Sequence, residues 1–119
     1  MKNTLKKDEI IKERKLINKI FSNSKSLNTY PFIIKYINYN DKLNLNSKTL
    51  ISVPKSKIKT AVNRNLIKRR IKESYRTNKA IIKNHSLLIA FIYNSDKVLD
   101  CKIILDSILK ILKKIRKDD

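Results

Sequence analysis

Apolar residues recur at helical spacing in three stretches of the chain, separated by polar and charged positions. The first stretch predicts an amphipathic helix that ends near residues 22–23, and its apolar residues are Ile10, Ile11, Ile17, Ile20 and Phe21. The second predicts a helix over about residues 59–79, with a narrow face made by Ile67, Ile71, Ser74 and Tyr75. The third predicts a closing helix from near residue 100 to residue 116, and its repeating residues are Cys101, Ile104, Leu105, Ile108, Leu112 and Ile115.

Other stretches have the composition of strands. Residues 30–38 are β-branched and aromatic, and Pro31 is acceptable there only at a strand start or edge. Residues 48–53 predict a second strand that ends at Pro54, because proline has no backbone N–H for a sheet. We expect these two strands to form an antiparallel hairpin. Residues 85–93 are continuously apolar and predict a buried strand inside the sheet, and the residues near Lys25–Leu27 allow a short additional strand.

This order of elements indicates one α+β domain over residues 1–119. The expected fold is a two-layer sandwich in which three helices pack on a mixed sheet of about four strands, in the order α-β-β-β-α-β-α. A chain of 119 residues is long enough for one hydrophobic core and too short for two independent ones.

The charge of the chain indicates what kind of partner it binds. The chain has 29 Lys and Arg against 10 Asp and Glu, a formal net charge of +19, which a polyanion such as nucleic acid would neutralise. The chain is also rich in Asn, Ile and Lys and has no Gly, a composition that AT-biased coding produces by itself. The placement of the cations therefore carries more weight than their total.

Several classes of function lack the residues they need. Cys101 is the only cysteine and His85 the only histidine, so zinc sites and Cys/His or Ser/His catalysis are not expected, and we expect no catalytic or metal-binding residue. The first 15 residues have no apolar signal-peptide core, and no apolar run approaches the ~18 residues that span a bilayer. We therefore expect a cytoplasmic protein with no membrane partner.

The strongest local imbalance of charge lies in residues 52–76. Nine cations stand there against Glu73 alone: Lys55, Lys57, Lys59, Arg64, Lys68, Arg69, Arg70, Lys72 and Arg76. On a helix these residues form adjacent basic rows opposite Ile67 and Ile71, and arginine binds phosphate through a bidentate fork. The pattern predicts a surface that docks RNA or DNA, and the alternative is an ordinary solvated face of a helix.

The same segment, read as Ser-Val-Pro-Lys-Ser-Lys-Ile-Lys-Thr-Ala-Val-Asn-Arg-Asn-Leu-Ile-Lys-Arg-Arg-Ile-Lys-Glu-Ser-Tyr-Arg, resembles the signature of the bacterial ribonuclease P protein component. The resemblance extends over nearly the whole chain. It departs from the family pattern at Leu66, where an arginine is usual, at Ser56 after Lys55, and at Ile17, where an aromatic residue is usual. The resemblance implies a left-handed crossover from residues 48–53 through the basic helix to the apolar strand, against the general right-handed preference.

The resemblance also implies a function, in which the protein binds a large catalytic RNA and assists removal of the 5′ leader from precursor tRNA. Magnesium ions held mainly by the RNA would drive that hydrolysis. The implied contacts with the catalytic RNA are Arg64, Asn65, Lys68 and Arg69, supported by Lys55, Lys59 and Lys72. The implied leader-binding cleft, between the first helix and the sheet, contains Phe21 and Lys35.

Some readings of these residues remain open. Phe21 is either such a platform or plain core, whereas Phe32, Ile34 and Tyr36 are assigned to the core. The alternative function is a non-enzymatic ribosomal or RNA-assembly protein. A DNA-binding module and a C-terminal helix that attaches to anionic membranes are weaker alternatives. No obligate protein partner is expected.

Overall fold

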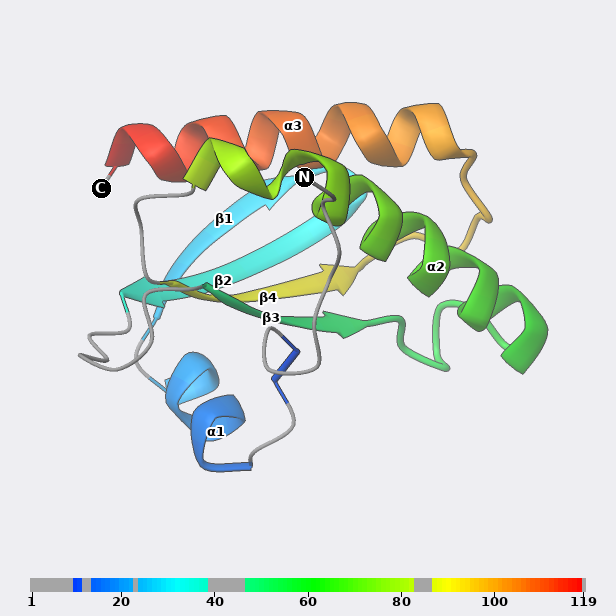
Figure 1. Cartoon of the computed structure of the whole chain (residues 1–119). Coiled ribbons are helices and arrows are strands. Elements are labelled where there is room, and N and C mark those ends of the chain that lie inside the picture. The colour runs from blue at the N-terminus through cyan, green and yellow to red at the C-terminus, as the bar shows by residue number, and fades with distance from the viewer. Residues whose placement is uncertain (1–9, 12–13, 23, 39–46, 83–86, 119) are drawn as a thin grey trace.

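The computed structural model describes residues 10–11, 14–22, 24–38, 47–82 and 87–118, which form four strands and three α-helices in one layered arrangement (Figure 1). The elements in chain order are α1 (Arg14–Ser22), β1 (Lys25–Thr29), β2 (Phe32–Asn38), β3 (Lys48–Ser52), α2 (Ala61–Asn78), the short 3-10 helix η2 (Lys79–Ile82), β4 (Leu87–Tyr93) and α3 (Cys101–Asp118). The expected α+β class and the expected order of helices and strands are confirmed, and the optional strand near residue 25 is present as β1.

The four strands form one mixed sheet in the order β1-β2-β4-β3. Strand β4 pairs antiparallel with β2, where Tyr36 lies opposite Ile89, and parallel with β3, where Leu50 lies opposite Ala90. The expected hairpin between β2 and β3 is therefore wrong, because β4 lies between them. The physical reason is burial, since six of the seven residues of β4 are buried and such a strand requires a neighbour on each side.

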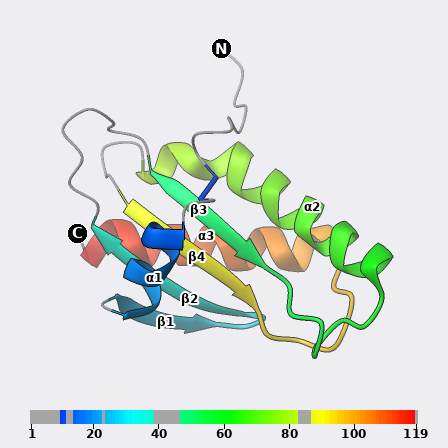
Figure 2. The same ribbon diagram turned by 90° about the horizontal axis from the view of Figure 1, so that it is seen from below.

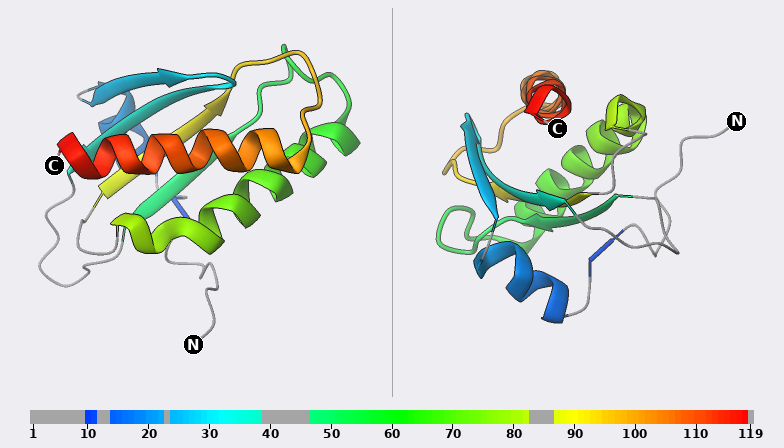
Figure 3. Two further views of the ribbon diagram at one scale, coloured as in Figure 1. Left: turned by 90° about the horizontal axis from the view of Figure 1, so that it is seen from above. Right: turned by 90° about the vertical axis from the view of Figure 1, so that its left-hand side faces the viewer.

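The connection from β3 to β4 through α2 is left-handed. Viewed from the side of α2 and α3, with both strands pointing upward, β4 lies to the left of β3 (Figure 3, left; Figure 1). About 98% of such crossovers are right-handed, so this connection is unusual. The handedness agrees with the expectation that came from the family resemblance.

Helices cover both faces of the sheet. Helices α2 and α3 lie on one face and α1 on the other (Figure 1; Figure 3, right). The larger core cluster lies between the sheet and α2 and α3 and contains Phe32, Ile34 and Tyr36, as expected. All four residues predicted to face the sheet from α2, namely Ile67, Ile71, Ser74 and Tyr75, are buried. Cys101, expected on the apolar face of α3, is instead exposed at the first residue of the helix.

The other face of the sheet carries a smaller core cluster under α1. Leu16 and Ile20 of the helix pack there with Leu88 and Ala90 of β4. Figure 2 shows α1 crossing only part of this face. Ile10 and Ile11 do not belong to the helix as expected: Ile10 forms a parallel bridge with Thr49, and the Ile11 amide donates to the Thr49 carbonyl at 2.8 Å. These residues cover the edge of β3, whose unpaired backbone groups favour a strand-like neighbour.

Candidate nucleic-acid interface

The predicted RNA-binding residues all lie on α2 or on the loop that leads into it. The helix begins at Ala61, where the Thr60 side chain accepts a 3.4 Å hydrogen bond from the Asn63 amide and so caps the first turn. Burial of Ile67, Ile71 and Tyr75 against the sheet fixes which side of the helix faces outward. The exposed positions of α2 therefore lie on the side of the helix that faces away from the sheet.

These residues form one surface, which we call the α2 surface: Lys55, Lys59, Arg64, Asn65, Lys68, Arg69 and Lys72. Asn65, Arg69 and Lys72 are exposed at spacings of four and three, and Lys55 and Lys59 are exposed in the preceding loop. Arg64 and Lys68 are half-buried. The structure thus brings the predicted set together along one helix and its leading loop.

Arg64 has a structural task that sequence reasoning missed. Its Nη1 atom donates to the carbonyl oxygens of Ile58 and Lys59, each at 2.9 Å. The guanidinium therefore ties the loop to the first turn of α2 and holds Lys59 in place. The signal in the sequence is faint, because the two acceptors are backbone atoms that any residue supplies.

Two other arginines of the basic segment are used within the fold. The Arg70 Nη1 atom donates to the Leu99 carbonyl oxygen at 2.6 Å. Arg76 pairs with Glu73 through both carboxylate oxygens, with Nε 3.3 Å from Oε2. This side-chain hydrogen bond lowers the pKa of Glu73 and raises the pKa of Arg76. Neither Arg70 nor Arg76 is therefore as available to a ligand as the uniform charge of the segment indicated.

An apolar strip crosses the α2 surface. Val62 is 78% exposed, and a surface hollow of about 450 Å³ is lined by Val62, Asn65, Leu66 and Arg69. Leu66 stands where the resemblance leads one to expect arginine, so aliphatic carbon replaces a phosphate-binding group there. Apolar side chains flanked by an amide and a guanidinium suit contact with ribose and base as well as phosphate.

The second candidate surface, which we call the α1 face, lies on the opposite side of the sheet. Lys35 is in register with Ala90, which packs under α1, so the Lys35 side chain points to the side of the sheet that carries α1. Phe21, near the end of α1, is 46% exposed. The reading of Phe21 as core is therefore wrong, while Tyr36 points to the other side and is buried. The sheet separates the α1 face from α2 (Figure 3, right).

The described residues contain no group of three His, Cys, Asp or Glu side chains arranged to hold a metal ion. The thiol of Cys101 is free and exposed. In the same part of the chain, no helix is both long and apolar enough to cross a membrane. The chemistry that the two surfaces do offer is multiple cation and amide donors on one side of the sheet, and an exposed ring on the other.

Comparison with known proteins points to one family. The chain matches the family model described as Ribonuclease P over residues 5–116. The ribonuclease P protein component of Porphyromonas gingivalis is 31% identical over 117 residues, which cover 93% of this chain and 85% of that protein.

Solved structures give the same result for the fold. The RNase P protein of Staphylococcus aureus superimposes with a TM-score of 0.73 at 25% identity, covering 90% of this chain and 94% of that one. The RNase P protein of Thermotoga maritima superimposes with a TM-score of 0.68 at 22% identity, covering 89% and 96% of the two chains.

Proposed function

This chain belongs to the ribonuclease P protein family, and we propose that its α2 surface binds the catalytic RNA while its α1 face binds the 5′ leader of precursor tRNA. Members of this family are protein subunits of an endoribonuclease that processes tRNA. The proposal adds which residues of this chain meet which RNA. It assigns no catalytic role to the chain's own side chains.

The observation that carries the proposal is the placement of the two surfaces on different sides of the sheet. The exposed side chains of Lys55, Asn65, Arg69 and Lys72 offer donors to a structured RNA over the length of α2. On the other side, Phe21 offers a ring to unpaired bases and Lys35 offers an ammonium to their phosphates. One protein of this size then contacts two RNA molecules without competition between them.

Magnesium belongs, in this proposal, to the RNA subunit. Phosphate oxygens are the hard ligands that Mg²⁺ prefers, and the bound ions would activate water and stabilise the leaving oxygen. The protein would contribute by neutralising phosphate repulsion, which lowers the magnesium concentration that the RNA requires. The proposal places the holoenzyme in the cytoplasm, where precursor tRNAs are made, and requires no further protein.

The test is cleavage of a precursor tRNA by a bacterial ribonuclease P RNA at low magnesium, with and without this protein. We expect the protein to stimulate cleavage at the mature 5′ end. Tight binding to the RNA without stimulation would contradict the proposal and would favour a structural RNA-binding protein. Stimulation at an incorrect position would contradict the assignment of the α1 face.

A further inference from the structure

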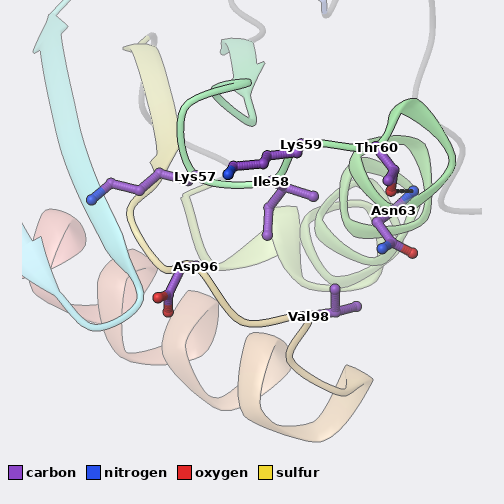
Figure 4. A pocket seen from close by; sticks show the side chains of 7 residues that line it. All are labelled: Lys57, Ile58, Lys59, Thr60, Asn63, Asp96 and Val98. Carbon is purple, nitrogen blue, oxygen red and sulfur yellow. Dashed lines mark hydrogen bonds between the residues drawn. The ribbon is translucent and has the colours of Figure 1, made fainter.

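A cavity of about 320 Å³ lies where the loop before α2 meets the loop between β4 and α3 (Figure 4). Seven residues line it: Lys57, Ile58, Lys59, Thr60, Asn63, Asp96 and Val98. Ile58 and Val98 approach each other from the two loops, Lys57 and Asp96 lie toward one end, and Thr60 and Asn63 lie toward the other (Figure 4). Asp96, Val98 and Asn63 belong to neither of the surfaces described above.

The first wall of the cavity is held in place by a network of hydrogen bonds. Arg64 binds the carbonyl oxygens of Ile58 and Lys59, as described above. The amides of Lys57 and Ile58 both donate to the Pro54 carbonyl oxygen, at 3.0 and 3.1 Å. The Ile58 side chain is 4% exposed and packs into the main core. This wall is therefore formed before any ligand arrives.

The second wall, the loop between β4 and α3, is held in place by hydrogen bonds to side chains of the protein. The Lys97 amide donates to the Ser95 hydroxyl at 3.1 Å, and the Leu99 amide donates to the Tyr93 hydroxyl at 3.3 Å. The Tyr93 hydroxyl also donates to the Lys97 carbonyl oxygen, and burial is the main cause that raises the pKa of this phenol. The loop that carries Asp96 and Val98 is thus held on both sides of Val98.

The charged side chains that line the cavity do not form ion pairs with one another. Within the described part of the chain, the Asp96 carboxylate forms no hydrogen bond or ion pair, although Lys57 and Lys59 line the same cavity. All three side chains are exposed. In a chain with a net charge of +19, a carboxylate on a hydrogen-bonded loop beside two ammonium groups suits a ligand that presents acceptors and donors together.

We propose that this cavity receives one unpaired nucleotide of the catalytic RNA, with guanine as the best-matched base. This inference rests on the proposed function and adds a base-reading site to it. The Watson–Crick edge of guanine carries the O6 acceptor beside the N1–H and N2–H donors. Lys57 would donate to O6, and Asp96 would accept from both donors, as charged side chains do when they read base edges.

The other parts of the nucleotide match the rest of the lining. One face of the base would lie against the exposed aliphatic side chain of Val98, and the mostly buried Ile58 would form the floor of the cavity. The ribose and phosphate would extend toward Thr60 and Asn63 at the start of α2, and the Lys59 side chain, which extends toward Lys57, adds a positive charge at the other end of the cavity (Figure 4). Uracil has one donor on the corresponding edge instead of two adjacent ones, so it would bind more weakly.

The test asks whether removal of one negative charge raises or lowers the affinity of the protein for RNA. Asp96→Asn removes a negative charge from a protein that binds a polyanion, and general electrostatics predicts tighter RNA binding. The proposal predicts the reverse, a loss of affinity for a bacterial ribonuclease P RNA of about fivefold or more, because the bidentate acceptor is lost. Asp106→Asn, which makes the same charge change at an exposed position of α3, is the matched control and should bind no more weakly than the wild type.

Equal or tighter binding by the Asp96→Asn variant would overturn the inference while leaving the proposed function intact, since the wild-type protein would still bind and stimulate the RNA. A second measurement titrates the full chain with guanosine 5′-monophosphate or uridine 5′-monophosphate and follows backbone amide resonances. We expect the amides of Asn63 and Val98 to shift at lower concentrations of the guanine nucleotide. Equal shifts with both nucleotides would also overturn it.

Discussion

The Nη1 atom of Arg70 donates a 2.6 Å hydrogen bond to the backbone carbonyl oxygen of Leu99. The bond joins the middle of α2 to the loop that leads into α3, across 29 positions of sequence. Arg69, the preceding residue, is instead exposed on the outer side of the same helix. Two adjacent arginines of one basic segment therefore have different tasks, and the difference is measurable.

We expect Arg70→Ala to lower the free energy of unfolding by about 1–2 kcal/mol, because it removes a charge-assisted hydrogen bond and leaves the Leu99 carbonyl without this donor. Arg69→Ala should change that free energy by less than about 0.5 kcal/mol, since its side chain is exposed. Urea titration followed by circular dichroism measures both values.

In RNA binding the order of the two variants should be reversed, with the larger effect for Arg69→Ala and the smaller one for Arg70→Ala. Arg69→Ala should weaken binding to a bacterial ribonuclease P RNA and reduce the salt dependence by about one phosphate contact. Under conditions where it is fully folded, Arg70→Ala should keep the wild-type salt dependence. Identical salt slopes for Arg69→Ala and the wild type would remove Arg69 from the interface.

Arg64 should behave as a residue that both holds the loop and contacts RNA. Arg64→Ala should speed hydrogen exchange at the Lys57 and Ile58 amides, because the loop that orders them is released. Arg64→Lys keeps the charge but cannot supply the planar fork, so it should restore the salt dependence and only part of the affinity. Full recovery of affinity by lysine would contradict the positioning role.

Glu73 is expected to restrain RNA binding through its pair with Arg76. Glu73→Gln removes the carboxylate that pairs with this arginine, so binding should tighten and its salt dependence should steepen by up to about one contact. The change is measured by filter binding over a series of salt concentrations. Glu73→Asp, which keeps the charge on a shorter side chain, is the control and should bind close to the wild type.

The pair also makes a prediction about pH. Hydrogen bonding by Arg76 lowers the pKa of Glu73 in the folded state, so its contribution to stability is present above the ordinary carboxyl pKa. That contribution is lost as the pH falls through the lowered pKa of the folded state. Because Glu73 is exposed and Arg76 is only half-buried, the effect is small, and it should be absent from Glu73→Gln in melting curves recorded across the acidic range.

Periodicity predicted the helices well because each one buries a single face. The predicted buried set of α2, which includes Ile67 and Tyr75, is the observed one. The spacing failed at Ile10 and Ile11, which are apolar because they cover the edge of β3 and not because they continue α1. The apolar character of a single residue does not show which element its side chain will pack against.

The pairing of strands was harder to predict than their positions. Nearness in sequence favoured a hairpin between β2 and β3, whereas β4, located far along the chain, takes the place between them. The sequence did contain the relevant fact, since a strand that is apolar on both faces needs two neighbours. The left-handed crossover had no such signal and followed only from the family resemblance.

The location of the candidate site was predictable, while the internal uses of its residues were not. Exposed Asn65, Arg69 and Lys72 follow from the helical spacing alone. The bonds of Arg64 and Arg70 go to backbone carbonyls of loops, and any residue type provides such acceptors. The cavity beside Asp96 depends on two loops that are distant in sequence, so only the folded structure reveals it.

Phe21 provides the sharpest test of the α1 face, because its ring is 46% exposed although it follows the buried residue Ile20. Phe21→Ala should lower the free energy of unfolding by about 1–2 kcal/mol, since about half of the residue's surface is buried. Phe32→Ala is the matched control: its ring is 2% exposed in the main core, and its loss should cost about 3–5 kcal/mol.

If the exposed ring stacks on leader bases, Phe21→Ala should weaken binding of a precursor tRNA to the holoenzyme by about 1–3 kcal/mol and leave binding of the mature tRNA unchanged. The comparison is made by competition with precursors that have and lack a leader of several nucleotides. Equal losses for precursor and mature tRNA would show that Phe21 acts through the fold and not through the leader. A loss confined to the longer precursor would instead place the leader on the α1 face, across the sheet from α2.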